Sequence, residues 1–283
     1  MPCPGFEVCG VFASTPFSGK AVLKILFIGD IVGSPGRKIV HDRLGDILAQ
    51  REIDLCIANG ENAASGFGIT PRLAQELLAD GIEVLSGGNH IWDRKEILEF
   101  FPHEPRLLRP ANFPNGSPGS GLFVGRTKKG AGFSVLNLQG RTFMIPIDDP
   151  FRTADAQLAK IPADVKVRLV DMHAEATSEK QAMGWYLDGK VSAVIGTHTH
   201  VATADERVLP GGTAVITDVG MTGPHDGVIG MDRHGIMQRF LDALPARFDV
   251  AQGDIQMNTV LLDVDESTGR ARSIERLRFR LEA

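Results

Sequence analysis

The chain has 283 residues and a formal net charge of -5, with 43% hydrophobic and 23% charged residues. This balance is that of an ordinary globular protein, and the acidic charge disfavours a broad nucleic-acid-binding surface. Aromatic residues make up only 6% of the chain, so extended platforms for stacking nucleic-acid bases are not expected. A small nucleotide site stays compatible with this charge, because metal ions can supply positive charge locally.

Residues 1–21 are rich in Gly, Pro and Ser and have no hydrophobic periodicity, which predicts a disordered N-terminal extension. They contain no basic region followed by an apolar core, so we expect no signal peptide. No apolar stretch approaches about 18 residues, which argues against a membrane span. Since the three cysteines form no disulfide framework, a cytoplasmic location is the simplest expectation. Residues 22–283 are expected to form a single domain.

The first half of the chain alternates apolar runs, typical of buried strands, with amphipathic stretches, typical of helices. Ser34 before Pro35 and Thr70 before Pro71 each match a capping residue followed by proline at the first helical position. The expected strands are 22–28, 55–58 and 83–86, and the expected helices are 35–50, 71–80 and 95–100.

The second half is richer in hairpins and predicts a second sheet. Strands are expected as hairpins within 121–144, at 167–170, 191–195 and 213–216, and in a closing hairpin of 259–264 and 273–281, with helices within 148–160 and at 178–188. Alternating strands and helices followed by hairpins predict an α/β fold, in which two mixed β-sheets pack together with helices outside them.

Five of the expected strands end in side chains that commonly bind metal ions. In open α/β sheets, ligands bind outside the carboxyl ends of the strands, so these side chains are expected to meet at one rim. Mixed oxygen and imidazole donors suit Mn, Fe or Zn better than Mg or Ca. The candidates are Asp30, Glu61, Asn62, Asn89, His90, His173, His198 and His200.

Each candidate taken alone has an ordinary structural explanation. Asp30 could cap a turn or a helix, Glu61, Asn62 and Asn89 could be turn residues, and His173 could be a structural histidine. The agreement of five separate strand ends is what favours a metal site.

Two metal ions at such a rim would be bridged by one carboxylate, either Glu61 or Asp30. They would make hydroxide available near neutral pH and neutralise the oxygens of a phosphate group. His90 would then protonate the leaving alkoxide or stabilise the charge that develops on it.

Short motifs in this series resemble those of the calcineurin-like metallophosphoesterases: GD at 29–30, GEN at 60–62, GNH at 88–90, HAE at 173–175 and GTHTH at 196–200. Longer stretches resemble the YmdB-type phosphodiesterases, namely ILFIGDIVGSPGR, ANGENAASGFGIT, GGNHIWD, VDMHAEATSEK and GTHTHV. The common superfamily pattern Asp-x-His is absent here, where Asp30 is followed by Ile31 and Val32. That departure is shared by the YmdB-type branch, and Asn62 would replace the missing imidazole.

The resemblance implies an α/β/β/α metallophosphoesterase sandwich that hydrolyses small phosphodiesters, notably 2',3'- or 3',5'-cyclic nucleotides. It also implies a homo-oligomer with two divalent or mixed-valence transition metal ions, either Fe or Mn, with Zn as an alternative. The implied ligands are Asp30, Glu61, Asn62 and His200 for one ion and Asn89, His173 and His198 for the other, with Glu61 bridging and His90 as the catalytic acid.

Other residues of the same region have less defined roles. Asp171 and Glu175 could orient His173 or simply be solvated. The loop at 66–68 could close over a substrate, although a plain flexible connector is the simpler interpretation, and segment 218–224 could wall the pocket. Outside the site we expect the buried core thiol of Cys56 and the histidines His41, His103, His225 and His234.

Two other functions remain open from the sequence. A phosphomonoesterase or a ribonuclease could use the same metal centre. A weakly active regulatory protein could bind a nucleotide through it.

Overall fold

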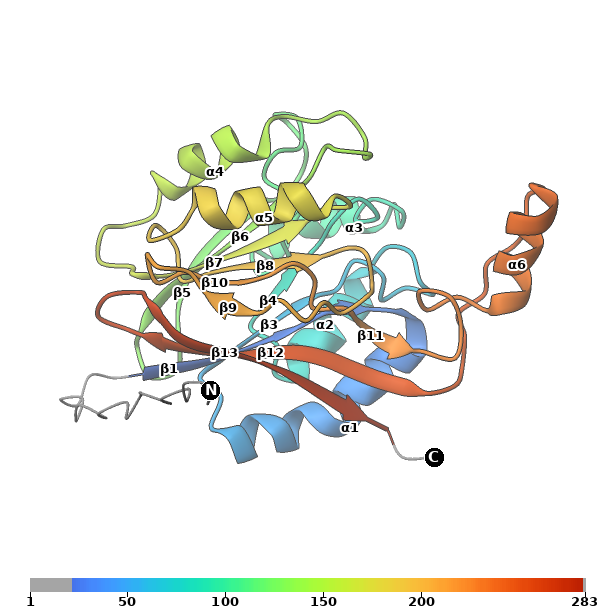
Figure 1. Ribbon diagram of the computed structural model, residues 1–283, viewed down its shortest axis with the longest axis horizontal. Helices are drawn as coiled ribbons and strands as arrows, with labels where there is room; N and C mark the ends of the chain where they lie inside the picture. The colour runs from blue at the N-terminus through green and yellow to red at the C-terminus, as the bar shows by residue number, and fades with distance from the viewer. Residues whose placement is uncertain (1–21, 282–283) are drawn as a thin grey trace, which may run out of the picture.

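The computed structural model describes residues 22–281 and contains two β-sheets stacked face to face, with helices on their outer sides (Figure 1). The predicted disordered extension, residues 1–21, lies outside the described residues. No helix within residues 22–281 is long and apolar enough to cross a membrane.

The first sheet contains seven strands. Parallel pairing joins β1 to β3 and β3 to β4, whereas β12 runs antiparallel to β1, β11 and β13. Neighbouring strands follow the order β2 (Asp30–Ile31), β11 (Met221–Pro224), β12 (Ile255–Asp265), β1 (Val22–Ile28), β3 (Leu55–Asn59) and β4 (Val84–Ser86). Strand β13 (Ala271–Arg280) lies outside this order and also pairs with β12.

The second sheet contains six strands, of which the four central ones are parallel. Its two edge strands, β5 and β9, are antiparallel to their neighbours. The order is β5 (Leu122–Arg126), β6 (Gly132–Gln139), β7 (Val167–His173), β8 (Ala193–Thr197), β10 (Ala214–Ile216) and β9 (Arg207–Val208).

Strand β1 shows why the apolar runs of the sequence are continuous rather than alternating. Ile25 and Phe27 point into the core between the two sheets, while Leu26 and Ile28 point into the core under the helices of the first sheet. Successive side chains of a strand face opposite sides, so a strand covered on both faces needs apolar residues at every position.

Four helices cover the outer faces of the sandwich (Figure 1). Helices α1 (Gly33–Arg51) and α2 (Pro71–Ala79) pack on the first sheet, and α4 (Pro150–Leu158) and α5 (Thr177–Tyr186) pack on the second. The short α3 (Ile97–Phe100) and the 3-10 turn η1 (Phe101–His103) follow β4. Helix α6 (Arg233–Asp242), together with the chain on either side of it, projects from the body between β11 and β12.

The predicted fold class and most predicted elements are confirmed, with shifts at several ends. Thr70 caps α2 as predicted, because its Oγ1 accepts a hydrogen bond from the backbone N–H of Leu73 at 3.3 Å. The prediction that Ser34 caps α1 is wrong, because the helix already begins at Gly33 and Val32 occupies the cap position. The hairpin predicted up to residue 144 ends with β6 at Gln139.

Five short elements were not predicted, namely β2, the 3-10 turn η1, β9, β11 and α6. The two-residue strands β2 and β9 are too short to show a period in the sequence. Helix α6 carries several exposed apolar side chains and buries only Ile236, so it lacks the pattern of a helix packed on a core.

Candidate metal centre

The carboxyl ends of strands from both sheets meet at one rim, as the sequence predicts. Asp30 lies just after β1, and the pair Glu61 and Asn62 follows β3. His173 is the last residue of β7, and His198 follows β8 directly. Ligand atoms of Glu61, His173 and His198 all lie within 4.8 Å of one another, so these three side chains could hold a metal ion.

The imidazole of His173 is the most constrained group of this rim. Its Nε2 lies 3.0 Å from Oε1 of Glu61, 3.0 Å from Oδ1 of Asn89 and 3.1 Å from Nδ1 of His198. One ring nitrogen can donate at most one hydrogen bond, so a single proton cannot satisfy three such neighbours. A cation shared by all four atoms would satisfy them together.

The other nitrogen of His173 indicates which tautomer the ring adopts. Nδ1 lies 2.9 Å from Oγ1 of Thr197, and that hydroxyl donates its single hydrogen to Oδ1 of Asp171 at 2.6 Å. Thr197 must therefore accept a hydrogen bond from Nδ1–H of His173. In the neutral form of the ring, the lone pair of Nε2 then faces the other ligand atoms, which is the usual arrangement of a metal-binding histidine.

Unpaired oxygens mark the second half of the rim. Oδ1 of Asp30 and Oδ1 of Asn62 are buried without a hydrogen-bond partner among the described residues. His200 lies beside them, with Nε2 at 3.2 Å from Nδ2 of Asn62 and 4.0 Å from Oδ1 of Asp30. Its Nδ1 lies 2.9 Å from the carbonyl of Ile229, so this nitrogen carries the proton. Unpaired buried acceptors are costly, and a bound cation would satisfy both of these oxygens.

Burial and neighbouring charges shift the pKa values of the acidic groups and of His173 at this rim. Burial raises the pKa of Asp30, and it raises the pKa of Asp171 to about 6. Burial also acts on Glu61, but the charge of His173 outweighs it and lowers the pKa of Glu61 to about 2. Burial opposes the imidazolium of His173, yet the charge of Glu61 raises the pKa of that ring to about 9. The rim therefore attracts positive charge, whether a proton or a metal ion.

Glu61 lies between the two halves of this rim. Its Oε1 contacts both His173 and Nδ2 of Asn62, the latter at 3.2 Å. Its Oε2 accepts a hydrogen bond from the backbone N–H of His90 at 3.0 Å. The residue before Asn89 must be glycine, because a Cβ on Gly88 would lie 2.2 Å from Nε2 of His173. The chain after β4 thus passes directly over the rim.

The turn that carries His198 and His200 is held in an uncommon backbone conformation. Their φ angles are 99° and 65°, in the left-handed region that non-glycine residues rarely adopt. Asp218 fixes the turn from behind, because its Oδ2 accepts hydrogen bonds from the backbone N–H and Oγ1 of Thr199 at 3.1 and 2.7 Å. Lys180 of α5 pairs with the same oxygen at 2.7 Å, and both charges are buried.

Neither Lys180 nor the interactions of Asp218 were identified from the sequence. Segment 218–224 was considered as a pocket wall, but Asp218 instead supports the histidine turn. The only signal in the sequence is a lysine on a helix next to the second sheet, which is indistinguishable from a solvated surface residue.

His90 lies beside the rim rather than within it. Its Nδ1 is 2.8 Å from Oδ2 of Asp93, and its ring is about one third exposed. The side chain lines a cavity of about 430 Å³ together with Glu61, His198 and His200. This position allows contact with a substrate that reaches the rim.

Asp171, Glu175 and the remaining histidines, whose roles were less defined from the sequence, lie in different surroundings. Asp171 is buried and contacts His173 through Thr197, so the solvated alternative is wrong for Asp171. Glu175 is half-exposed and contacts Nε2 of His198 at 3.1 Å rather than His173. The remaining histidines have other neighbours: His41 pairs with Asp80, His225 with Gly223 and Asn258, and His234 with Asp232, while His103 ends η1.

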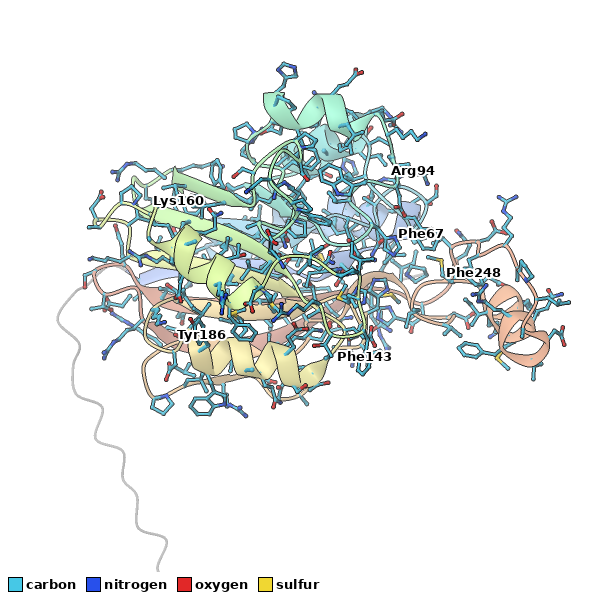
Figure 2. All side chains as sticks on the ribbon, turned by 90° about the horizontal axis from the view of Figure 1, so that it is seen from above. Phe67, Arg94, Phe143, Lys160, Tyr186 and Phe248 are labelled. Carbon is cyan, nitrogen blue, oxygen red and sulfur yellow. The ribbon has the colours of Figure 1, made fainter. Side chains whose placement is uncertain are left out.

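The opposite wall of the cavity is apolar and was largely missed. Its side chains come from the glycine-rich loop after β3, from α6 and from the chain on either side of α6. Figure 2 shows Phe67 on the body and Phe248 beside the projecting arm. The wall residues are Phe67, Ile229, Met231, Ile236 and Phe248.

Residues 26–277 match the family of YmdB-like proteins. The chain belongs to this family. It is 51% identical over 255 residues to the 2',3'-cyclic-nucleotide 2'-phosphodiesterase of Bacillus subtilis strain 168, covering 90% of this chain and 96% of that protein. The name of this relative agrees with the predicted enzyme class, a phosphoric diester hydrolase. The resemblance to the YmdB-type metallophosphoesterases is thereby confirmed.

Two solved structures that align with most of this chain have the same fold. A hypothetical protein from Thermus thermophilus superposes with a TM-score of 0.85 at 42% identity, covering 91% of this chain and 99% of that one. A phosphatase from Mycoplasma pneumoniae superposes with a TM-score of 0.87 at 33% identity, covering 93% and 95%. The YmdB-like chain therefore has the metallophosphoesterase sandwich that its sequence predicts.

Proposed function

We propose that this YmdB-like chain is a dinuclear metal-dependent phosphodiesterase that hydrolyses small cyclic nucleotides. The observation that carries the proposal is the convergence of three ligand atoms on Nε2 of His173, beside the unpaired buried oxygens of Asp30 and Asn62. The name of the Bacillus subtilis relative favours 2',3'-cyclic nucleotides over the 3',5' isomers.

The proposed ligand sets follow the two halves of the rim. Glu61 bridges both ions in this proposal, a role supported by its contacts with His173 on one side and Asn62 on the other. Mixed oxygen and nitrogen donors favour Fe or Mn, with Zn as an alternative. One ion is assigned to Asp30, Glu61, Asn62 and His200, and the other to Glu61, Asn89, His173 and His198.

Bound ions would supply hydroxide at neutral pH and neutralise charge on the phosphate oxygens. The side chains of the protein perform the remaining tasks. Thr197 and Asp171 keep the lone pair of His173 directed into the rim. Asp93 holds Nδ1 of His90, which leaves Nε2 as the nitrogen that donates a proton to the leaving oxygen of the ribose.

Two further properties belong to the proposal. A homo-oligomer is proposed on the family resemblance. A cytoplasmic location is proposed on the absence of a disulfide framework, and the thiol of Cys56 is free and buried in the core. We also propose that residues 22–283 act as a single domain.

The test combines metal analysis with hydrolysis assays on the purified protein. We expect two transition metal ions per chain and hydrolysis of adenosine 2',3'-cyclic phosphate that a chelator abolishes and Mn²⁺ restores. Adenosine 3',5'-cyclic phosphate, a phosphomonoester and a short oligoribonucleotide serve as competing substrates. Faster hydrolysis of the monoester or the oligonucleotide would replace the proposal with a phosphomonoesterase or a ribonuclease. Turnover no better than that of a His90→Ala variant would favour a regulatory nucleotide-binding protein.

A further inference from the structure

The cavity at the rim has two chemically different ends. One end contains the proposed metal ligands and His90, and the other is the apolar wall that includes Phe67 and Phe248. The volume of about 430 Å³ lies within the range of sites that bind small molecules. A phosphate bound at the polar end would place the rest of its molecule against the apolar wall.

Two hydrogen bonds join the loop that carries Phe67 to Arg94. Arg94 donates hydrogen bonds from Nη2 to the carbonyl of Ala64 at 2.7 Å and from Nε to the carbonyl of Phe67 at 3.0 Å. Gly66 has a φ of 88°, a backbone conformation that residues with a side chain rarely adopt. The loop at 66–68 thus forms part of the cavity wall, and it is joined to Arg94 through Phe67 and the nearby Ala64.

The ring of Phe67 adjoins the proposed catalytic group. Its centroid lies 5.1 Å from that of His90, with the two ring planes inclined at 70°. An aromatic group in contact with Phe67 would thus lie within reach of the residue that protonates the leaving oxygen.

Phe248 approaches the same cavity from the arm that contains α6. The guanidinium carbon of Arg239 lies 5.8 Å from its ring centroid. The base of the arm is joined by a hydrogen bond of 2.7 Å from the backbone N–H of Asp232 to the carbonyl of Asp249. Both Phe67 and Phe248 also line a neighbouring cavity, so the two residues are shared by the linings of both cavities.

We propose that Phe67 and Phe248 form the nucleobase-binding subsite of the active site, an inference that rests on the proposed function. Every base has an aromatic face that stacks on such rings, whatever its pattern of hydrogen-bonding groups. The side chains of Ile229, Met231 and Ile236 offer no hydrogen bond that would read a base edge. The subsite therefore accepts both purines and pyrimidines, and it binds the larger purines more tightly.

The test compares substrates with and without a base. Adenosine 2',3'-cyclic phosphate and 1-O-methylribose 2,3-cyclic phosphate present the same reacting group to the wild type and to Phe67→Ala, Phe248→Ala and the double variant. Base stacking predicts a loss in kcat/KM of about 5- to 100-fold on the nucleotide for each single variant, mainly through KM. The substrate without a base should change less than about 2-fold on the same scale.

Matched variants separate stacking from general damage. Phe143→Ala and Phe240→Ala remove rings that are 90% and 80% exposed and do not line the cavity, so neither should alter the ratio between the substrates. Phe67→Leu keeps apolar bulk and should lose the nucleotide preference, whereas Phe67→Trp should keep it. Binding of adenosine 3'-phosphate and ribose 3-phosphate, measured by calorimetry, reports on the subsite without turnover.

The outcomes distinguish the subsite from the proposed function. Equal losses on both substrates, or equal binding of the two products, would overturn the subsite while the hydrolysis itself upholds the phosphodiesterase. Hydrolysis of neither substrate would overturn the proposed function. Tighter binding of adenosine 3'-phosphate that Phe67→Leu removes would still uphold a base-binding subsite in that case.

Discussion

The two walls of the cavity at the rim are built in opposite ways. The polar wall comes from strand ends of the central sandwich, where Glu61 and Asn62 are buried and contact each other at 3.2 Å. The partly buried His198 and His200 contact His173 and Asn62, respectively. The apolar wall comes from a loop and an arm outside the strands, and its rings are only partly buried. In the proposed function the strand ends position the reacting groups, whereas the segments between strands shape the space for the rest of the substrate.

The largest effect is expected on replacing Glu61, which lies between the two halves of the rim. Glu61→Ala should remove both metal ions and lower hydrolysis by at least about 10³-fold, because the proposed bridge is lost. Metal content per chain and kcat are the measurements. The Glu175→Ala variant is the comparison, since Glu175 contacts only His198 from a half-exposed position. Two ions retained in Glu61→Ala would contradict the bridging role.

The support behind the histidine turn should be the next most sensitive point. Lys180→Met leaves the buried carboxylate of Asp218 without its cation, which should cost about 3 to 5 kcal/mol of unfolding free energy. Lys180 is 3% exposed, whereas the Lys190 side chain in its ion pair with Asp155 is 49% exposed. Lys190→Met should therefore cost at most about 1 kcal/mol in the same denaturant titration. Similar losses for the two variants would show that the buried pair does not stabilise the turn.

A smaller effect, on metal affinity, is expected when the hydrogen bond between His173 and Thr197 is removed. Thr197→Val keeps the shape of the side chain but removes the hydroxyl between the imidazole and Asp171. Metal affinity should fall by about 10- to 100-fold, as for other losses of a hydrogen bond to a metal-binding histidine. Thr197→Ser retains the hydroxyl and should keep most of the affinity in a competition assay with a chelator. If valine and serine behaved alike, the tautomer of His173 would not depend on Thr197.

The smallest effect is expected far from the rim, in the hairpin of β12 and β13. Hydrogen bonds from Ser267 and Arg272 hold the pKa of Asp265 well below its usual range. A carboxylate with a depressed pKa stabilises the fold above its unfolded pKa of about 4, and this contribution fades as pH falls towards the folded pKa. The wild type should exceed Asp265→Asn in unfolding free energy at pH 7, and the difference should shrink below about pH 4. A constant difference across this range would exclude the linkage.

The polar wall could be predicted from the sequence because its rule is local. An apolar run followed by Asp30, Glu61 or His173 is visible within a few residues, and parallel strands bring such ends together. The prediction that strand ends of both sheets meet at one rim did not require knowing the order of the strands within each sheet. Even the misplaced end of the strand at 167–170, which continues to His173, left the ligand at the carboxyl end.

The apolar wall and the support behind the turn could not be predicted in this way. Phe67 and Phe248 are separated by more than half of the chain, and no period connects them. Lys180 and Asp218 are separated in the chain by the three strands β8, β9 and β10, and the pair exists only because α5 covers the second sheet. Contacts of this kind depend on packing between elements, which a sequence pattern does not describe.

The sequence by itself determined the sandwich, the position of most buried strands along the chain and the side chains at their carboxyl ends. Strand periodicity and side-chain chemistry are properties of neighbouring residues, so they can be inferred without coordinates. Only the tertiary structure decided which nitrogen of His173 faces the rim, what holds the turn at His198 and which rings enclose the cavity. Each of these depends on distances between segments remote in sequence, and those distances are set when the two sheets and their helices pack together.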